Sequence, residues 1–134
     1  MYGIKLLMSH GLNSPSIFTI TQSLVLSRLT YASPAWWGFT NSSDKARLEA
    51  VMHRAVRWGL YDSKAPTLSD ICERADDRLF NSLLTNPTHA LQTILPAVKS
   101  QPYNLRKRTH NLTLPKKDHP LIEKNFICRM LYRN

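Results

Sequence analysis

The sequence predicts a mostly α-helical protein: a small bundle of about four to five helices, followed by a basic and largely irregular C-terminal arm. Apolar residues recur at helical spacing over the first two-thirds of the chain, and glycine and proline separate these stretches. The 134 residues are 43% hydrophobic, which is enough for a folded core. After Pro96 the spacing gives way to basic residues. We therefore expect a helical domain over residues 1–96, an extended basic arm over 97–120, and a short apolar segment over 121–134 that docks on the core.

Two helices are expected before residue 34. The first covers residues 2–10 and is ended by Gly11, which tolerates a left-handed backbone. Ser14 is the expected N-cap of the second helix, and Pro15 occupies its first position. Pro34 is expected to end this helix, because the residue before a proline is disfavoured in helical geometry.

A third helix is expected over residues 44–61, with the Asp44 carboxylate at the positive end of the helix dipole. The residues whose spacing defines its inward face are Leu48, Val51, Met52, Ala55 and Gly59. Three cations share another face, namely Arg47, Arg54 and Arg57. Such a stripe either follows the phosphates of a nucleic acid or is simply solvated, and the sequence leaves both interpretations open.

The fourth helix has the clearest start. Pro66 precedes Thr67, and Asp70 follows three residues later, which is close to a capping box. The residues expected to form its buried stripe are Leu68, Ile71, Cys72, Ala75, Leu79 and Leu83. The residues expected to face solvent are Glu73, Arg74, Asp77 and Arg78. Asn86 and Pro87 end this helix. Residues 88–95 can form one further short helix, and residues 122–131 are apolar enough for a strand or a short helix.

The charge of the chain favours a polyanionic partner. Eighteen lysine and arginine residues against nine acids give a net charge of +9 at pH 7. Nucleic acid is the first expectation and an anionic membrane surface the second. No stretch is typical of a secretory signal or of a bilayer span, and two cysteines are too few for a disulfide framework. We therefore expect an intracellular protein that is neither secreted nor transmembrane.

The basic arm contains the strongest candidate for nucleic-acid contact. Arg106, Lys107 and Arg108 stand next to one another, shortly after Tyr103. Adjacent cations can pair with phosphates while an aromatic ring stacks on a base. The alternative is a tract that resembles a nuclear-localisation signal or that only adds solubility.

No catalytic, cofactor-binding or metal-binding constellation is expected. Polymerase chemistry needs carboxylates that hold two magnesium ions. The only adjacent acidic pair, Asp76 and Asp77, falls inside the fourth helix, where neighbouring side chains point about 100° apart. His110, His119 and Cys128 lack the short paired spacing of zinc ligands.

Residues 27–39, SRLTYASPAWWGF, contain an aromatic corner, which we define as Tyr31, Pro34, Trp36 and Trp37. Large aromatic side chains beside a proline are expected to pack one helix against the next, and the two tryptophans to face different ways. This stretch resembles the region after the polymerase core in reverse transcriptases of non-LTR (LINE-type) retrotransposons. The further stretches that resemble this family, in the same order, are residues 44–61, 73–91, 103–114 and 125–132.

The resemblance implies a helical thumb and post-thumb region that grips a primer–template or an RNA, separated from a polymerase core whose Tyr-x-Asp-Asp motif is missing here. We therefore expect a non-catalytic chain that binds RNA or RNA–DNA duplex without sequence specificity and whose parent protein supplies the core. The residues assigned to phosphate contacts are Arg47, Arg54, Arg57, Arg106, Lys107 and Arg108, with Tyr103 assigned to base stacking. The alternative is a host protein that retains these helices as a protein-interaction scaffold, and a third option is binding to anionic lipid.

Overall fold

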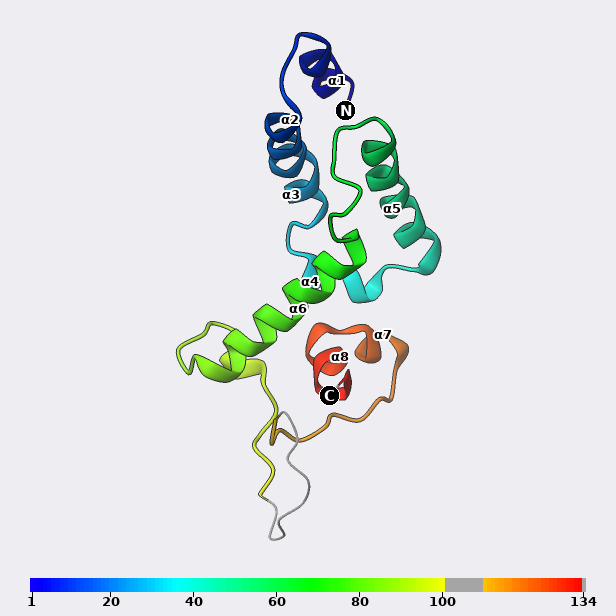
Figure 1. Cartoon of the computed structure of the whole chain (residues 1–134). Coiled ribbons are helices and arrows are strands. Elements are labelled where there is room, and N and C mark those ends of the chain that lie inside the picture. Colours follow the sequence, from blue (N-terminus) through cyan, green and yellow to red (C-terminus); the bar gives the residue numbers. More distant parts are fainter. Residues whose placement is uncertain (101–109, 134) are drawn as a thin grey trace. The chain divides into compact units, whose positions relative to one another are not determined.

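The computed structural model describes residues 1–100 and 110–133 (Figure 1). Its α-helices are α1 (Tyr2–Ser9), α2 (Ser14–Thr21), α3 (Ser27–Leu29), α4 (Ser33–Trp36), α5 (Ser42–Arg57), α6 (Leu68–Thr85), α7 (Pro120–Lys124) and α8 (Phe126–Arg133). Within the described residues there is no strand, and the β-type pairing is one isolated antiparallel bridge between Val98 and Leu112. The predicted mostly α-helical fold class is confirmed. None of the described helices is long and apolar enough to cross a membrane.

The chain divides into two compact units. Unit 1 comprises residues 1–33 and 40–73, and unit 2 comprises residues 34–39 and 74–134. Helix α6 begins in unit 1 and continues into unit 2. The three segments expected from the sequence, 1–96, 97–120 and 121–134, follow one another along the chain. Each of the two units, in contrast, is made of two stretches of chain that are separated in sequence.

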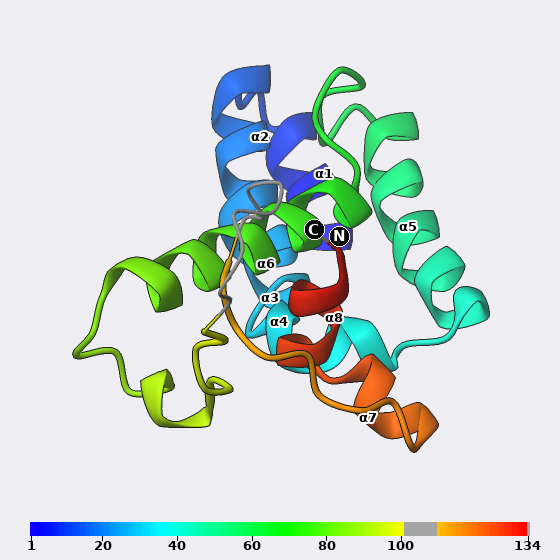
Figure 2. The ribbon, with the colours of Figure 1, turned by 90° about the horizontal axis from the view of Figure 1, so that it is seen from below.

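Unit 1 is built from α1, the α2–α3 segment, α5 and the first turns of α6. Helix α1 lies against α2 (Figure 2). The buried residues at the centre of this unit are Ile4, Ile17, Ala55 and Leu60, and Phe18 and Trp58 are among the side chains packed against them. The inward face of α5 expected from helical spacing therefore supplies Ala55 to the core.

The helix expected to run up to Pro34 is interrupted and ends earlier. Helix α2 passes into a π-helical turn over Gln22–Leu26, and α3 ends at Leu29. The hydroxyl groups of Ser23 and Thr30 donate to carbonyl oxygens four residues back, at 2.7 and 2.9 Å. Hydrogen bonds of this kind compete with the helical ladder and bend helices. Pro34 instead lies at the second position of α4, where a missing backbone N–H costs nothing.

Two helices begin on asparagines that the sequence pattern did not identify as caps. The Asn13 side chain accepts a hydrogen bond from the Ser16 N–H at 3.0 Å, so Asn13, and not Ser14, is the N-cap of α2. The Asn41 side chain accepts from the Asp44 N–H at 2.7 Å, and α5 therefore begins before residue 44.

Gly11 and Gly59 end α1 and α5 with positive φ angles of 89° and 67°. The Gly59 N–H donates to the Val56 carbonyl and the Leu60 N–H to the Ala55 carbonyl, both at 2.9 Å, which is a Schellman motif. The stop at Gly11 is confirmed. Gly59 was expected on the inward face of a longer helix, and that expectation is wrong, because the residue terminates α5 and directs Leu60 into the core.

The expected start of α6 is confirmed. The Thr67 N–H donates to the Asp70 carboxylate and the Asp70 N–H donates to the Thr67 hydroxyl, both at 3.1 Å. These reciprocal bonds form the capping box. Helix α6 also ends where expected, immediately before Asn86 and Pro87.

Unit 2 is held together by α6 and α8. Its core contains Phe80 and Leu83 of α6 with Ile127, Met130 and Leu131 of α8. Of the two conformations left open for residues 122–131, the structure has helices, namely α7 and α8.

The helix expected over residues 88–95 is reduced to a 3-10 turn at Gln92–Ile94. The Asn86 side chain accepts from the Thr88 N–H at 3.0 Å, and the His89 ring accepts from the Leu91 N–H at 3.1 Å. These local bonds occupy backbone donors that a helix would use.

Candidate functional site

The basic face of α5 lies at the surface of unit 1. Arg47, Arg54 and Arg57 are all exposed, and the Arg47 side chain is 82% exposed. Arg47 pairs with Asp44 at 3.5 Å, an exposed ion pair of a kind that contributes at most about 1 kcal/mol. Arg54 and Arg57 occupy the last turn of α5, where the carbonyl ends of the helix favour cations. The three guanidinium groups can therefore reach phosphates with little loss of internal structure.

Most of the positive charge belongs to unit 2. Its sequence holds eleven lysine and arginine residues against four acids, whereas unit 1 holds seven against five. A surface with such an excess attracts polyanions over distances comparable with the Debye length, about 10 Å at 0.1 M salt.

The expected arm residues Tyr103, Arg106, Lys107 and Arg108 lie outside the described residues. The described chain on both sides of them is fixed in place. The Lys99 N–H donates to the Asn111 carbonyl at 2.6 Å. Two residues further from the tract on each side, the Thr113 N–H and hydroxyl group donate to the Ala97 carbonyl at 2.9 and 3.0 Å. The two ends of the basic tract are therefore brought together on unit 2.

His110 anchors one of these ends in the core. It is 8% exposed, and its ring meets the Phe80 ring edge-to-face with centroids 5.9 Å apart. The Leu112 N–H donates to its Nδ1 at 3.3 Å, and its Nε2 lies 3.1 Å from the Leu131 carbonyl. Because Nδ1 accepts, Nε2 carries the proton and donates to Leu131. This histidine, whose spacing from His119 and Cys128 did not predict a zinc site, is a packing residue.

The aromatic corner is divided between the two units. Trp37 is buried with 3% exposure and meets the half-buried Trp36 edge-to-face, with centroids 5.7 Å apart and planes at 76°. The expected difference between the two tryptophans is therefore present. Tyr31 belongs to unit 1 and is 80% exposed. The expectation that Tyr31 packs between helices is wrong, because most of its ring surface stays in contact with solvent.

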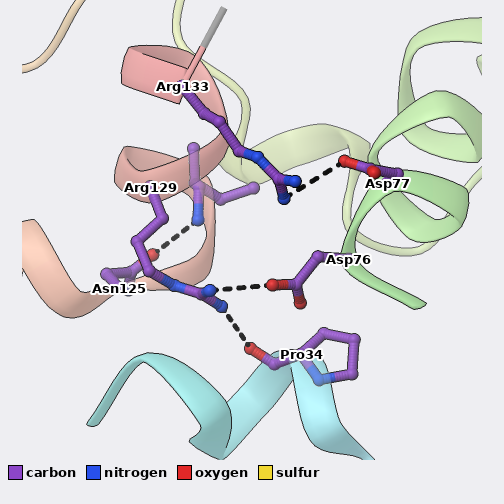
Figure 3. A network of polar contacts seen from close by, with 7 residues as sticks. Pro34, Asp76, Asp77, Asn125, Arg129 and Arg133 are labelled. Carbon is purple, nitrogen blue, oxygen red and sulfur yellow. Dashed lines mark hydrogen bonds and ion pairs between the residues drawn. The ribbon is translucent and has the colours of Figure 1, made fainter. Parts of the chain in front are cut away.

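A polar network in unit 2 connects α8 with α6 and with residues 34–39, which we call the corner segment (Figure 3). The Arg129 guanidinium donates to the Asp76 carboxylate at 2.7 Å and to the Pro34 carbonyl at 3.5 Å. Asp76 is fully buried, whereas its neighbour Asp77 is about half exposed and lies 3.4 Å from Arg133. The acidic pair therefore docks α8 against α6.

Sequence reasoning missed Asp76 and Arg129 as a structural pair. Asp76 follows the buried Cys72 by four residues, so helical spacing already placed it on the apolar stripe of α6. A carboxylate on such a stripe requires a cationic partner. The partner lies 53 residues away and cannot be found from local spacing.

An apolar cavity of about 220 Å³ lies in unit 2, beside this network. Its walls come from the corner segment, α6, the 3-10 turn and the junction of α7 with α8, and include Phe39, Leu79, Leu91, Ile94, Asn125 and Phe126. Phe39 and Ile94 are 44% and 55% exposed, so the cavity has an apolar rim that faces solvent. Asn125 is the only polar residue among its described lining residues.

Among the described residues, the Cys128 thiol and the Tyr61 phenol have perturbed acidity. Burial raises the pKa of the Cys128 thiol, and the nearby Lys117 ammonium partly offsets this. Burial, with a smaller contribution from Asp62, raises the pKa of the Tyr61 phenol. Both shifts keep the group neutral, so neither produces a nucleophile or a base at pH 7. Cys128 behaves as a small core residue, as does the fully buried Cys72.

Among the described residues, no group of three or more histidine, cysteine, aspartate or glutamate side chains is placed to hold a metal ion. Comparisons of the chain with protein-family models, with curated proteins and with solved structures gave no match. The resemblance to retrotransposon reverse transcriptases therefore rests on the sequence stretches alone.

Proposed function

We propose that this chain is a non-catalytic nucleic-acid-binding region of a retrotransposon-type RNA-directed DNA polymerase. The observation that carries the proposal is the junction at Lys99–Asn111, which brings the two ends of a basic tract together on the more basic unit. Arg106, Lys107 and Arg108 fall within that tract. On this proposal they contact phosphates of RNA or of an RNA–DNA duplex, and Tyr103 stacks on a base.

The exposed arginines of α5 form a second contact surface in the proposal. Arg47, Arg54 and Arg57 line one side of a helix whose other side carries buried Met52 and Ala55. A rigid helix with separated guanidinium groups suits a regular phosphate backbone. Contacts of this kind position a protein without reading sequence, which fits non-specific binding.

The test is the salt dependence of binding to an RNA–DNA duplex. Six phosphate contacts predict that the logarithm of the association constant falls with a slope of about −5 against log salt, or roughly 10³-fold between 50 and 200 mM. The triple variant R106A/K107A/R108A should reduce the slope by about 3. The matched control is R28A/K64A/R74A, which removes the same charge from exposed positions outside the proposed surface and should leave the slope nearly unchanged. An affinity that changes less than about tenfold over this salt range, or equal effects of the two triple variants, would refute the proposal.

A second candidate function, a protein-interaction scaffold, is favoured by the exposed apolar side chains of α1. Tyr2, Leu6, Leu7 and Met8 are between 41% and 81% exposed. Apolar side chains gathered on one short helix are typical of a surface that another protein covers. In the parent polymerase that protein surface would belong to the core. A one-to-one complex with a single protein, lost in Leu7→Glu and formed without nucleic-acid affinity, would favour this candidate over the first.

A further inference from the structure

The apolar cavity of unit 2 has the dimensions and chemistry of a site for one flat ring. A dry cavity of about 150 Å³ is large enough to bind benzene. The cavity here is about 220 Å³ and is bordered by the Phe39 and Phe126 rings. Asn125 adds a single polar group, whose Oδ1 already accepts from the Ile127 N–H at 2.9 Å. What Asn125 can offer a ligand is therefore its Nδ2 donor.

The walls of the cavity are held at fixed positions. Arg129 binds both Asp76 of α6 and the Pro34 carbonyl, and Pro34 itself lines the cavity (Figure 3). Gly38 approaches so closely that a Cβ atom there would collide with the Lys124 carbonyl and the Arg129 side chain. The corner segment, α6 and the α7–α8 junction are thus joined before any ligand arrives. Such preorganisation lowers the entropic cost of binding.

The charged residues that directly adjoin lining residues along the sequence are cationic. They are Arg78, beside Leu79, and Lys124, beside Asn125. Both are exposed. Asp76, the carboxylate one turn before Leu79 and Phe80, is buried and paired with Arg129. A ligand that combines a flat ring with negative charge complements this arrangement.

We infer that this cavity binds one unpaired nucleobase of a single-stranded nucleic acid, an inference that rests on the proposed nucleic-acid-binding function. The base stacks against Phe39, and its ring nitrogen or carbonyl accepts a hydrogen bond from Asn125 Nδ2. Its flanking phosphates meet Lys124 and Arg78. A base within a duplex cannot enter, because both of its faces and its pairing edge are occupied. The site therefore adds a preference for single strands to non-specific phosphate binding.

The test compares a single-stranded RNA of about ten nucleotides with a blunt duplex of the same length, by fluorescence anisotropy at about 100 mM salt. Phe39→Ala removes the stacking face and should weaken single-strand binding by roughly fivefold to 150-fold, the effect of losing one stacked base. Ala35→Phe fills the cavity from an exposed lining position and should have the same effect. Duplex binding should change less than about twofold in both variants.

The matched control is Leu121→Ala, which removes an apolar side chain that is 58% exposed on α7 and outside the cavity. It should bind both probes like the unaltered chain. Circular dichroism of each variant checks that helix content is retained. The fluorescence of a 2-aminopurine base placed in the single strand should fall when the unaltered chain binds. The Phe39→Ala variant, added at a concentration that saturates the strand, should leave this fluorescence unchanged.

The outcomes separate this inference from the proposed function. If the unaltered chain binds both probes and the cavity variants change neither affinity nor quenching, the inference is overturned and the proposed function stands. If the unaltered chain binds neither probe even at low salt, the proposed function fails and the inference fails with it. If a labelled acidic peptide with one phenylalanine binds, and Ala35→Phe weakens the peptide but not the RNA, the cavity is a protein-docking site and the inference is wrong.

Discussion

Removing Arg129 should destabilise unit 2 far more than removing Arg133, although both arginines lie on α8 and pair with α6. Asp76 has no exposed side-chain surface and lies 2.7 Å from Arg129. Asp77 and Arg133 are 49% and 42% exposed and lie 3.4 Å apart. Arg129→Ala leaves a buried carboxylate without its partner, which costs about 3–5 kcal/mol. Arg133→Ala removes a surface pair worth at most about 1 kcal/mol.

Urea unfolding followed by tryptophan fluorescence can measure this difference in unit 2. Trp36 and Trp37 both belong to unit 2, and Trp58 is the tryptophan of unit 1. In a Trp58→Phe background, the fluorescence therefore reports on unit 2. With a slope of about 1 kcal/mol per molar urea, Arg129→Ala should lower the midpoint by about 3 M or more, and Arg133→Ala by less than about 1 M.

A double variant distinguishes the cost of an unpaired charge from the worth of the pair. The Asp76 Oδ1 and Arg129 Nε atoms are buried without a hydrogen-bond partner among the described residues. The pair is therefore incompletely compensated for its loss of hydration. Asp76→Leu with Arg129→Met should be within about 1 kcal/mol of the unaltered chain, or more stable. Equal effects of Arg129→Ala and Arg133→Ala, or a double variant as unstable as the sum of its single changes, would refute this reasoning.

Three further changes test the packing. Gly38→Ala forces a Cβ atom against the Lys124 carbonyl and should cost about 1–3 kcal/mol, whereas Gly3→Ala, with open space around its Cβ, should be neutral or stabilising in the same urea titration. Thr67→Ala removes the α6 capping box and should cost about 1 kcal/mol, seen as a lower melting temperature by circular dichroism, whereas an unchanged temperature would exclude a role for the cap. Burial raises the pKa of the Cys128 thiol above its ordinary value, so the unfolded chain ionises first, and the stability is complete below the ordinary pKa of a thiol and falls as the pH rises above it. Cys128→Ala should remove part of this alkaline loss, and identical pH profiles would contradict the assignment.

The existence of most helices could be predicted because their signals are local. The capping box at Thr67, the stop at Gly11 and the break at Asn86 each depend on residues within one turn, and each is confirmed. The helix boundaries that were predicted wrongly also have local causes, namely side-chain hydrogen bonds to the backbone that compete with the helical ones. Asn13 caps α2 one residue before the expected Ser14, and hydroxyl groups such as that of Thr30 bond to the backbone where the pattern predicts a continuous helix.

The tertiary pairs could not be predicted because their members are distant in sequence. Asp76 and Arg129 are 53 residues apart, and His110 and Leu131 are 21 apart. Helical spacing could show that residue 76 lies on an apolar stripe, but it could not select Arg129 from eighteen cations. For the same reason the cavity, whose walls come from four separate segments, has no signature in the sequence.

The pairing of charges in unit 2 separates the cations that hold the fold from those that can bind a ligand. Asp76 and Asp77 pair with Arg129 and Arg133. Apart from these two pairs, the sequence of unit 2 holds nine cations and two acids. This remaining excess repels itself in the compact state and gains from any polyanion that neutralises it. The arginines of α8 are therefore poor candidates for phosphate contacts. The tract between Lys99 and His110, whose two ends are brought together by the Lys99–Asn111 hydrogen bond, is the better one.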